Sequence, residues 1–352
     1  MKALRWYAKK DIRLEDMAVP PVGPDQVKVQ VKWCGICGSD IHEYQAGPFI
    51  IPTKPHPMPG SKMPPIVLGH EFSGVIAEVG SNVKNTKAGQ RVAIRPTMPC
   101  YQCYWCKKGQ HIQCSALGAM GGSYDGAFSE YAVIPNDCVY KMPDKLSFED
   151  ASLAEPLACA VHAVRRSGLR PGHTVAVIGA GPIGLLTMQV AKAAGAASVY
   201  VVEVIEKRSK IALKLGAEAV FNPTQVDPGK EIAKATEGRR VDIAFECVGS
   251  PEAMMTALKT SMKGGTILAM GMMEKTCDFP FLTLFLQEKT IIASQGYTDE
   301  FPTAVSYLAD GRVNVAPLIT AKIKLDDIIE EGFKVLTSER KLDHFKIIVS
   351  PE

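Results

Sequence analysis

The segment TVAVIGAGPIG, residues 174–184, constrains the fold of this chain more than any other stretch. A short apolar run typical of a buried strand leads directly into three glycines spaced as GxGxxG, and a helical pattern follows them. In this context the first glycine, Gly179, makes the tight turn, Gly181 lets the backbone approach a pyrophosphate, and Gly184 lets helix and strand pack closely. The segment therefore predicts a dinucleotide site at a helix N-terminus.

The residues after this segment repeat the same alternation. Apolar runs such as SVYVVE, VDIAFECVG and GGTILAMG are separated by the amphipathic stretches EKRSKIALKLGA and PEAMMTALKTS. Runs of this kind predict a parallel sheet covered by helices on both faces. We expect a Rossmann-type, doubly wound α/β domain over residues 153–297.

The cofactor site predicted from this domain extends beyond the glycines. Glu203 ends the second strand nineteen residues after Gly184, where an acid is expected to meet the ribose hydroxyls of NAD and to repel the 2′-phosphate of NADP. Arg208 follows one helical turn later and is interpreted either as a ribose contact or as a solvated helix residue. The expected cofactor contacts are Gly179, Gly181, Pro182, Ile183, Gly184, Glu203, Arg208, Val248 and Gly271.

The rest of the chain has a different pattern. From residue 2 to about residue 138, short alternating segments such as VKVQVKW and EFSGVIAEVG are broken by Gly and Pro, which predicts an antiparallel β-rich domain. From about Tyr297 short β-like runs return. We therefore expect a domain of residues 1–152 that residues 298–352 complete. Residues 47–65 hold seven prolines in nineteen positions and predict either a surface loop or a loop that covers the site.

Four cysteines lie within fifteen residues, spaced C-x2-C-x2-C-x7-C. Four thiolates in one loop make a closed tetrahedral zinc site with no position for substrate, so we expect this zinc to be structural. Disulfides are disfavoured in the cytoplasm, and an iron–sulfur cluster lacks other redox machinery in the sequence. His111 lies inside the loop and is redundant as a ligand. The expected ligands are Cys100, Cys103, Cys106 and Cys114.

Composition excludes several classes of partner. The 352 residues carry 40 Lys and Arg against 37 Asp and Glu, scattered along the chain, so neither nucleic acid nor an anionic membrane is expected to bind. No apolar run approaches the roughly 18 residues that a membrane helix needs. The N-terminus, MKALRWYAKKDIRLED, has no apolar signal region, and we expect a cytoplasmic protein.

Three dispersed residues are candidates for a second metal site. Cys37 in CGICGSDIH, His70 in LGHEFSG and Glu155 in AEPLACA offer a sulfur, a nitrogen and an oxygen, as a catalytic zinc with an open position requires. Spacing alone does not decide this, because a lone Cys or His is more often part of a core than a metal ligand.

The motifs taken together add a resemblance. CGICGSDIHEY, GHEFSG, the four-cysteine loop, the EP at Glu155 and GAGPIG occur in one order, and the chain resembles the zinc-dependent medium-chain alcohol dehydrogenases over essentially its whole length. The resemblance implies a GroES-like catalytic domain, two zinc ions per chain, and Cys37, His70 and Glu155 as ligands of the catalytic zinc. It makes Glu71 either a ligand or a carboxylate close to the metal, with a salt bridge behind the metal as the plainer alternative.

The resemblance also implies a reaction. Zinc lowers the pKa of a bound alcohol so that hydride can leave to NAD, and the alcohol proton passes through Ser39 and the nicotinamide ribose to His42 near solvent. Without the family pattern, Ser39 would be an ordinary turn residue and His42 an exposed one.

Within this family the chain resembles the polyol and diol branch, and most of all the butanediol dehydrogenases, through GPFIIP, KPHP and PPIVLGHEFSG. The resemblance implies 2,3-butanediol and acetoin as substrates, with sorbitol or threonine as alternatives, and Tyr44 as a substrate contact. The loop at Tyr297 lacks the arginine of sorbitol-type relatives, which fits a small diol. Homodimers or homotetramers, often joined through the cofactor domains, are the family expectation.

Overall fold

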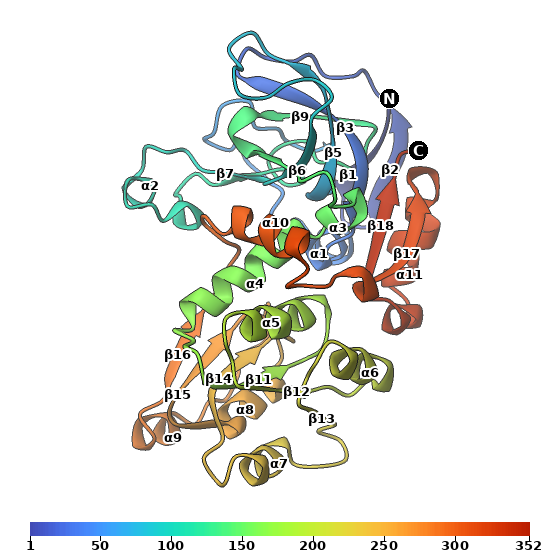
Figure 1. Cartoon of the computed structure of the whole chain (residues 1–352). Coiled ribbons are helices and arrows are strands. Elements are labelled where there is room, and N and C mark those ends of the chain that lie inside the picture. Colours follow the sequence, from blue (N-terminus) through green and yellow to red (C-terminus); the bar gives the residue numbers. More distant parts are fainter. The chain divides into compact units, whose positions relative to one another are not determined.

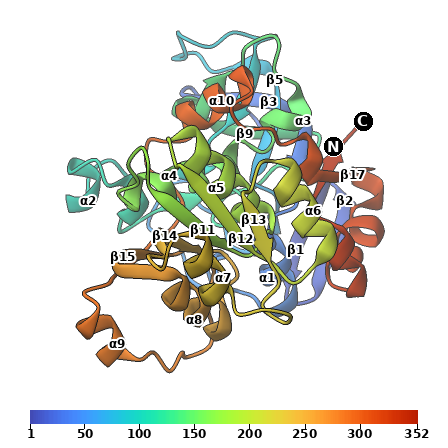
Figure 2. The same cartoon turned by 60° about the horizontal axis from the view of Figure 1, so that its bottom comes forward.

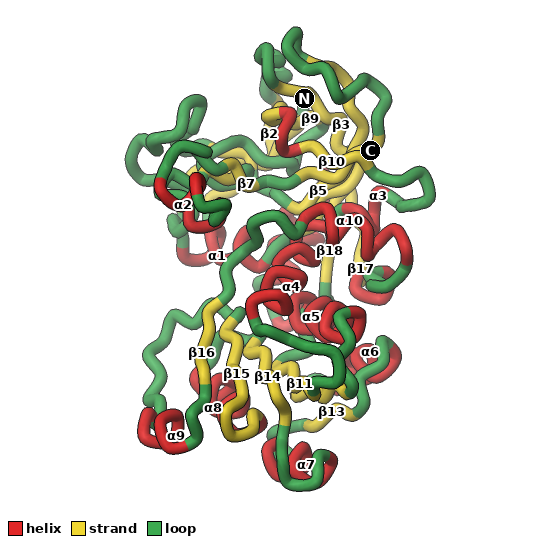
Figure 3. The backbone as a smooth tube through the Cα atoms, turned by 60° about the vertical axis from the view of Figure 1, so that its left-hand side comes forward, coloured by secondary structure: helices red, strands yellow, loops and turns green.

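The apolar runs after residue 153 form one six-stranded sheet in which all neighbouring strands are parallel. Its strands are β11 (Thr174–Ile178), β12 (Ser198–Val202), β13 (Ala219–Phe221), β14 (Val241–Glu246), β15 (Ser261–Ala269) and β16 (Thr290–Ala293). They lie in the order β13-β12-β11-β14-β15-β16, and several are seen side by side in Figure 3. The direction of winding reverses between β11 and β14, which is where a doubly wound sheet places its ligand.

Helices cover both faces of this sheet, so the doubly wound architecture predicted from the sequence is confirmed. Its helices are α4 (Ala154–Arg166), α5 (Pro182–Ala193), α6 (Glu206–Lys214), α7 (Pro228–Ala235), α8 (Pro251–Thr260) and α9 (Phe281–Leu286). In Figure 1, α5 and α6 lie above the sheet and α7 and α8 below it. Helix α5 is apolar on almost all sides and is buried along most of its length, as expected for a helix packed closely on a parallel sheet.

The first part of the chain forms sheets that are largely antiparallel. Its strands are β1 (Lys2–Ala8), β2 (Asp11–Asp16), β3 (Gln26–Gly35), β4 (Ile66–Val67), β5 (Glu71–Val79), β6 (Arg91–Ile94), β7 (Thr97–Met98), β8 (Gly118–Ala119), β9 (Tyr131–Pro135) and β10 (Val139–Lys141), with β17 (Ile319–Lys324) and β18 (Lys346–Ser350) from the C-terminal end. The largest sheet has the order β10-β6-β5-β3-β18-β17, with β9 also paired to β3. Smaller sheets are β2-β1-β4 and β7-β8.

Strand β3 shows why this sheet has one buried face. Val27, Val29 and Val31 are almost fully buried while the residues between them are partly exposed, which is the two-residue period of a half-buried strand. The C-terminal strand β18 pairs with β3 through Ile348 and Val349. The last residues of the chain therefore belong to the same sheet as residues 26–35, and both termini lie in this part of the molecule (Figure 1).

The remaining α-helices are α1 (Gly38–Ala46), α2 (Tyr104–Lys107), α3 (Phe148–Ala151), α10 (Phe301–Asp310) and α11 (Lys334–Leu336). The computed structural model describes all residues from 1 to 352. None of its helices combines the length and apolar character needed to cross a membrane.

The chain divides into two units. One comprises Met1–Glu155, Ala304–Ala309 and Leu318–Glu352, and the other Pro156–Thr303 and Asp310–Pro317. Figure 2 shows the parallel strands β11, β12 and β14 of the second unit with α5 beside them. The first division falls close to residue 152, and helix α10 is shared between the units. The domain limits predicted from the sequence stay a prediction.

Candidate active site

The site begins where strand β3 ends and helix α1 starts. Cys37 directly precedes the helix, and the carboxylate of Asp40 accepts a hydrogen bond from the Cys37 backbone N–H at 2.9 Å. Such a return bond satisfies one of the amides around a helix N-terminus, and it holds the residue before the helix in place. Cys37 is thus fixed where the helix dipole favours a negative ligand.

His70 lies against two side chains of this helix. Its Nδ1 is 3.6 Å from the Asp40 carboxylate, and its Nε2 is 3.5 Å from the Ser39 hydroxyl. Burial would lower the pKa of His70, but the nearby negative charges of Asp40 and Cys37 raise it well above its ordinary value. A carboxylate on one ring nitrogen is how proteins orient a histidine that offers its other nitrogen to a metal.

Asp40 was not singled out in the sequence. The signal that could have found it is an acidic residue three positions after Cys37 at the start of a helix, as in a capping box.

Glu71, at the start of strand β5, is held by a lysine from the far end of the chain. Both of its carboxylate oxygens lie 2.8 Å from Nζ of Lys346, which also donates to the backbone carbonyl of Ile36 at 3.1 Å. Burial would lower the pKa of Lys346, but the charge of Glu71 raises it above its ordinary value. A Cβ at Gly35 would collide with the carboxylate, so the glycine leaves the room that Glu71 occupies.

Three ligand atoms meet at this point. A sulfur of Cys37, a nitrogen of His70 and an oxygen of Glu71 all lie within 4.8 Å of one another. One soft sulfur, one imidazole and one carboxylate form a donor set that suits a zinc ion with an open position. The residues present therefore fit the catalytic metal that the sequence predicts.

Glu155 takes a different place. It lies in the first turn of α4 and lines the cavity beside His70, but it is outside the group of close ligand atoms. Burial is the main cause that raises the pKa of the Glu155 carboxyl to about 7. Its direct coordination of a metal stays a prediction.

A cavity of about 120 Å³ opens beside these ligands, within the first unit. It is lined by Ser39, Asp40, Glu43, Ile50, His70, Pro96, Thr97, Ala119, Met120, Gly121 and Glu155. Ile50 belongs to the proline-rich segment, so part of that segment borders the site and does not merely cover the surface.

Two predicted site residues do not line this cavity. The Tyr44 ring lies nearly perpendicular to that of Phe333, with 5.6 Å between centroids, and packs against the core. Glu43, which the sequence did not single out, lines the cavity instead. The His42 ring lies 5.2 Å from the ring of Phe49.

The four cysteines of the second cluster converge as their spacing predicts. Their sulfurs all lie within 4.8 Å of one another, and the Cys100 and Cys106 sulfurs are 4.0 Å apart. Four sulfurs bound tetrahedrally at about 2.3 Å from zinc would be about 3.8 Å apart. Backbone N–H groups point at the sulfurs, and those of Cys106 and Ser115 lower the pKa of Cys103 to about 6. The cluster fits a closed zinc site.

A buried arginine fastens this loop to the sheet. The guanidinium of Arg95 donates to the Tyr101 hydroxyl at 3.1 Å and to the Asp137 carboxylate at 3.2 Å. The Tyr101 hydroxyl donates to the same carboxylate at 2.6 Å. Burial first, and then this bond to Asp137, raise the pKa of Tyr101 to about 12.

The predicted dinucleotide turn has the geometry that its glycines imply. Gly179 has a φ of 97°, and a Cβ there would lie 2.6 Å from a methyl group of Val248. A Cβ at Gly184 would collide with the Gly179 carbonyl, so helix and strand could not pack as they do. A Cβ at Gly181 would meet nothing within 4 Å. Gly181 therefore faces open space at the N-terminus of α5, as a pyrophosphate requires.

The carboxylate of Glu203 lies beside the glycine turn and accepts hydrogen bonds from three backbone N–H groups. One carboxylate oxygen accepts the N–H of Ala180 at 2.7 Å, and the other accepts those of Val204 and Ile205 at 2.8 and 2.9 Å. Glu203 therefore shapes the glycine turn and its own strand end, and it also lines the neighbouring cavity.

That cavity, of about 400 Å³, lies within the second unit. Gly179, Gly181, Glu203, Arg208 and Val248 are among its lining residues. Pro182 and Ile183 start helix α5, and Gly271 packs so closely on Gly249 that a side chain would collide with it. The structure therefore brings most of the predicted cofactor residues together, with Gly271 in a packing position beside them.

The loop around Tyr297 is held by a buried carboxylate. Glu300 accepts the backbone N–H groups of Thr298 and Asp299 at 2.7 and 3.0 Å and lies 2.9 Å from Nδ1 of His162. Burial opposes ionisation, but the bond to His162 and those to the loop lower the pKa of Glu300 to about 2. His162, which lies in helix α4, is therefore the partner that ties this loop to that helix.

Comparison with known proteins identifies relatives over the whole chain. The family model described as "Alcohol dehydrogenase GroES-like domain" matches residues 23–144, and that described as "Zinc-binding dehydrogenase" matches residues 182–310. (R,R)-butanediol dehydrogenase of Bacillus subtilis (strain 168) is 42% identical over 352 residues, which is 100% of both chains. Sorbitol dehydrogenase of the same organism is 33% identical and covers 100% of this chain and 97% of its own.

The fold agrees with a solved structure of the same kind. The X-ray crystal structure of 2R,3R-butanediol dehydrogenase from Bacillus subtilis superposes with a TM-score of 0.93 at 40% identity. The match covers 100% of this chain and 99% of the other.

Proposed function

Because the chain belongs to the zinc-dependent medium-chain alcohol dehydrogenase family, we propose that it is an NAD-linked enzyme that interconverts 2,3-butanediol and acetoin. The observation that carries this proposal is the cluster of Cys37, His70 and Glu71 at the edge of a small cavity. Bound there, zinc would lower the pKa of an alcohol hydroxyl and so prepare hydride transfer to NAD.

The side chains around the cluster are assigned either to metal binding or to proton transfer. Cys37 and His70 would hold the metal, with Glu71 or Glu155 as the carboxylate ligand. Ser39 accepts the hydroxyl proton, since its own hydroxyl lines the cavity beside His70. The proton would then pass through the nicotinamide ribose to His42, which lies one turn further along α1 and would release it to solvent.

The shape and charge of the cavity support a small neutral substrate. About 120 Å³ suits a four-carbon diol better than a six-carbon polyol. Asp40, Glu43 and Glu155 line the cavity, and carboxylates disfavour a substrate that carries a carboxylate of its own, such as threonine.

NAD is the proposed cofactor. The carboxylate of Glu203 lines the cavity next to the glycine turn and would repel a 2′-phosphate. Arg208 lines the same cavity, and its role as a ribose contact remains part of the proposal. The second zinc, held by the four cysteines, has a structural role because sulfur would occupy every position around it.

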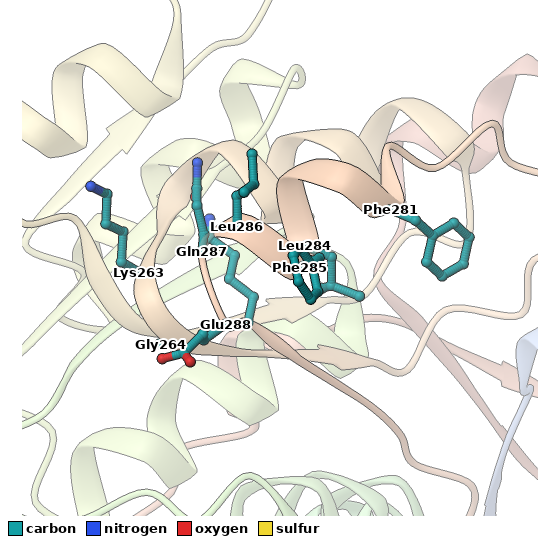
Figure 4. Close-up of a pocket in the computed structure, with 9 residues that line it drawn as sticks. Lys263, Gly264, Phe281, Leu284, Phe285, Leu286, Gln287 and Glu288 are labelled. Atoms are coloured by element: carbon teal, nitrogen blue, oxygen red, sulfur yellow. The ribbon is translucent and has the colours of Figure 1, made fainter.

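We propose that two copies associate through the edge of the parallel sheet. Strand β16 is the last strand of that sheet and leaves one side unpaired. Helix α9 precedes it with exposed apolar side chains, including Phe281 and Phe285, which is 76% exposed. These residues and Leu284, drawn in Figure 4, are among those that line a hollow. Its volume is about 1000 Å³. A two-fold axis would pair β16 with its own copy and cover both helices at once.

Sedimentation measurements on Phe285→Asp test this association, with Leu213→Asp on the exposed surface of α6 as the matched control. Dissociation of the first variant alone supports the proposal, and an unchanged dimer contradicts it. A tetramer in the wild type would add a second interface. We also propose a cytoplasmic location, where thiols stay reduced and the cysteines of both clusters would be available as metal ligands.

Initial rates of NADH formation with 2,3-butanediol, sorbitol and threonine test the substrate. We expect kcat/KM to be at least tenfold higher for butanediol. A preference for sorbitol or threonine would keep the family and the site but contradict the proposed substrate. The same assay with NADP in place of NAD tests the role of Glu203.

A further inference from the structure

Glu43 is a buried carboxylate with no assigned role. It lies in helix α1 one position after His42, is 2% exposed, and lines the cavity beside the metal ligands. Its partners are backbone amides, not a basic side chain. An ionised carboxylate is costly to bury without strong donors, so we ask which part of the chain these hydrogen bonds hold in place.

The amides belong to three consecutive residues of the proline-rich segment. The Phe49 N–H donates to both carboxylate oxygens, at 2.9 and 3.0 Å. The Ile50 and Ile51 N–H groups donate to one of them, the latter at 3.3 Å. A Cβ at Gly47 would collide with the same carboxylate, so the chain can turn closely around it. A single side chain therefore holds the backbone of residues 49–51.

These three residues face three different surroundings. The Phe49 ring contacts the His42 ring, and Ile51 is buried in the core. Ile50, between these two residues in the sequence, lines the cavity. Ile50 also lies against Gly122, where a Cβ would come within 2.7 Å of its methyl group. The position of Ile50 is thus set from both sides, by the amide bonds to Glu43 and by contact with the loop at Gly122.

We propose that Glu43 is a positioning residue that determines substrate specificity by holding Ile50 as a wall of the cavity. The inference rests on the proposed function for its substrate class, a vicinal diol. With residues 49–51 fixed, the cavity accepts a four-carbon diol and excludes one with a longer chain. When the carboxylate is lost, residues 49–51 move and Ile50 no longer narrows the cavity. The kcat/KM for longer diols then rises relative to that for short ones.

The test compares Glu43→Gln and Ile50→Ala with the wild type. Glu43→Gln keeps the size of the side chain but removes its charge and turns one of the two acceptor oxygens into an amide NH₂ donor. Asp227→Ala is the control, because it removes an N-cap of helix α7 in the other unit and costs about 1 kcal/mol without touching the segment. The measurements are the hydrogen exchange of amides 49–51 and the ratio of kcat/KM for 2,3-butanediol to that for 2,3-hexanediol.

We expect Glu43→Gln to exchange these amides at least tenfold faster and to lower the ratio at least fivefold. Ile50→Ala should lower the ratio to a similar degree, and it does not depend on whether Glu43→Gln folds. If Glu43→Gln only lowers Tm, as Asp227→Ala does, or if Ile50→Ala leaves the ratio unchanged, the inference is overturned. If the wild type oxidises neither diol, the proposed function fails, and the exchange comparison alone decides whether Glu43 positions the segment.

Discussion

The two clusters of metal-ligating side chains in this protein are assembled in opposite ways. The four cysteines come from fifteen consecutive residues, and one short loop brings their sulfurs together. Cys37, His70 and Glu71 come from two segments, and Lys346, which holds Glu71, comes from a strand 275 residues further along the chain. A local cluster depends on its own loop, whereas a dispersed cluster depends on the whole sheet being folded.

The largest expected effect tests the dispersed cluster directly. Cys37→Ser replaces a soft ligand with a weak one, and we expect kcat/KM to fall at least about 1000-fold and zinc content to fall by half. Metal analysis and steady-state kinetics measure both. Cys34→Ser is the matched control, because Cys34 is buried nearby but lies outside the cluster. Equal zinc loss in both variants would contradict the assignment.

The lysine at the end of the chain gives the second test. Lys346→Met leaves Glu71 buried without its partner, and we expect a loss of about 3–5 kcal/mol in the free energy of unfolding. Adding Glu71→Gln should restore most of the loss, since no uncompensated charge remains. Urea unfolding measures it. Lys322→Met, which breaks a more exposed pair with Glu149, should change little.

A third test uses pH. The pKa of Glu300 is lowered from an ordinary 4.5 to about 2, so its ionised form stabilises the fold. This contribution is fully present above about pH 4.5 and is lost as the pH falls toward 2. It corresponds to about 3 kcal/mol, and Glu300→Gln should remove it at pH 7 but make little difference near pH 2.

Urea unfolding of Glu300→Gln at several pH values checks this dependence. Glu206→Gln, which changes an exposed carboxylate, should leave the pH profile unchanged. If the free energy of unfolding differs between Glu300→Gln and the wild type by the same amount from pH 7 down to 3, the charge of Glu300 does not stabilise its contacts with His162 and the loop amides.

The smallest effect is expected at the four-cysteine loop. Cys106→Ser should release the second zinc and lower stability by about 2–3 kcal/mol, while kcat at low temperature stays within a few-fold of the wild type. Thermal unfolding and zinc content measure this outcome. His111→Ala should neither release zinc nor lower stability, because His111 does not belong to the group of converging zinc ligands. A loss of kcat as large as that of Cys37→Ser would remove the contrast between the clusters.

The dinucleotide turn was predictable for the same reason as the cysteine loop. Gly179, Gly181 and Gly184 act through backbone conformation and close packing within six residues. Both requirements select glycine, so they appear in the sequence as the spacing GxGxxG. Glu203 was found by its distance along the chain, but its bonds to the amides of Ala180 and Ile205 were not, because backbone amides carry no sequence signal.

The catalytic surroundings show where prediction from sequence stopped. Cys37 and His70 were recognised from motifs, and the role of Tyr44 as a substrate contact, implied by the resemblance, stays a prediction. Glu43, which lines the cavity, was not singled out in the sequence. Adjacent positions on a helix point about 100° apart, so Glu43 and Tyr44 face different surroundings, and only the folded helix shows that Glu43 lines the cavity while Tyr44 packs against the core. Asp40 is close in sequence to Cys37, yet its second contact, with His70, exists only after folding.

The sequence by itself determined the parallel and antiparallel parts of the fold, the glycine turn and the four-cysteine loop, because each depends on neighbours within a few residues. Only the tertiary structure decided that Lys346 holds Glu71, that Glu43 holds residues 49–51 and that His162 meets Glu300. In each of these pairs a buried charge needs a partner, and the partner comes from a segment that only folding brings near, so no local pattern identifies it.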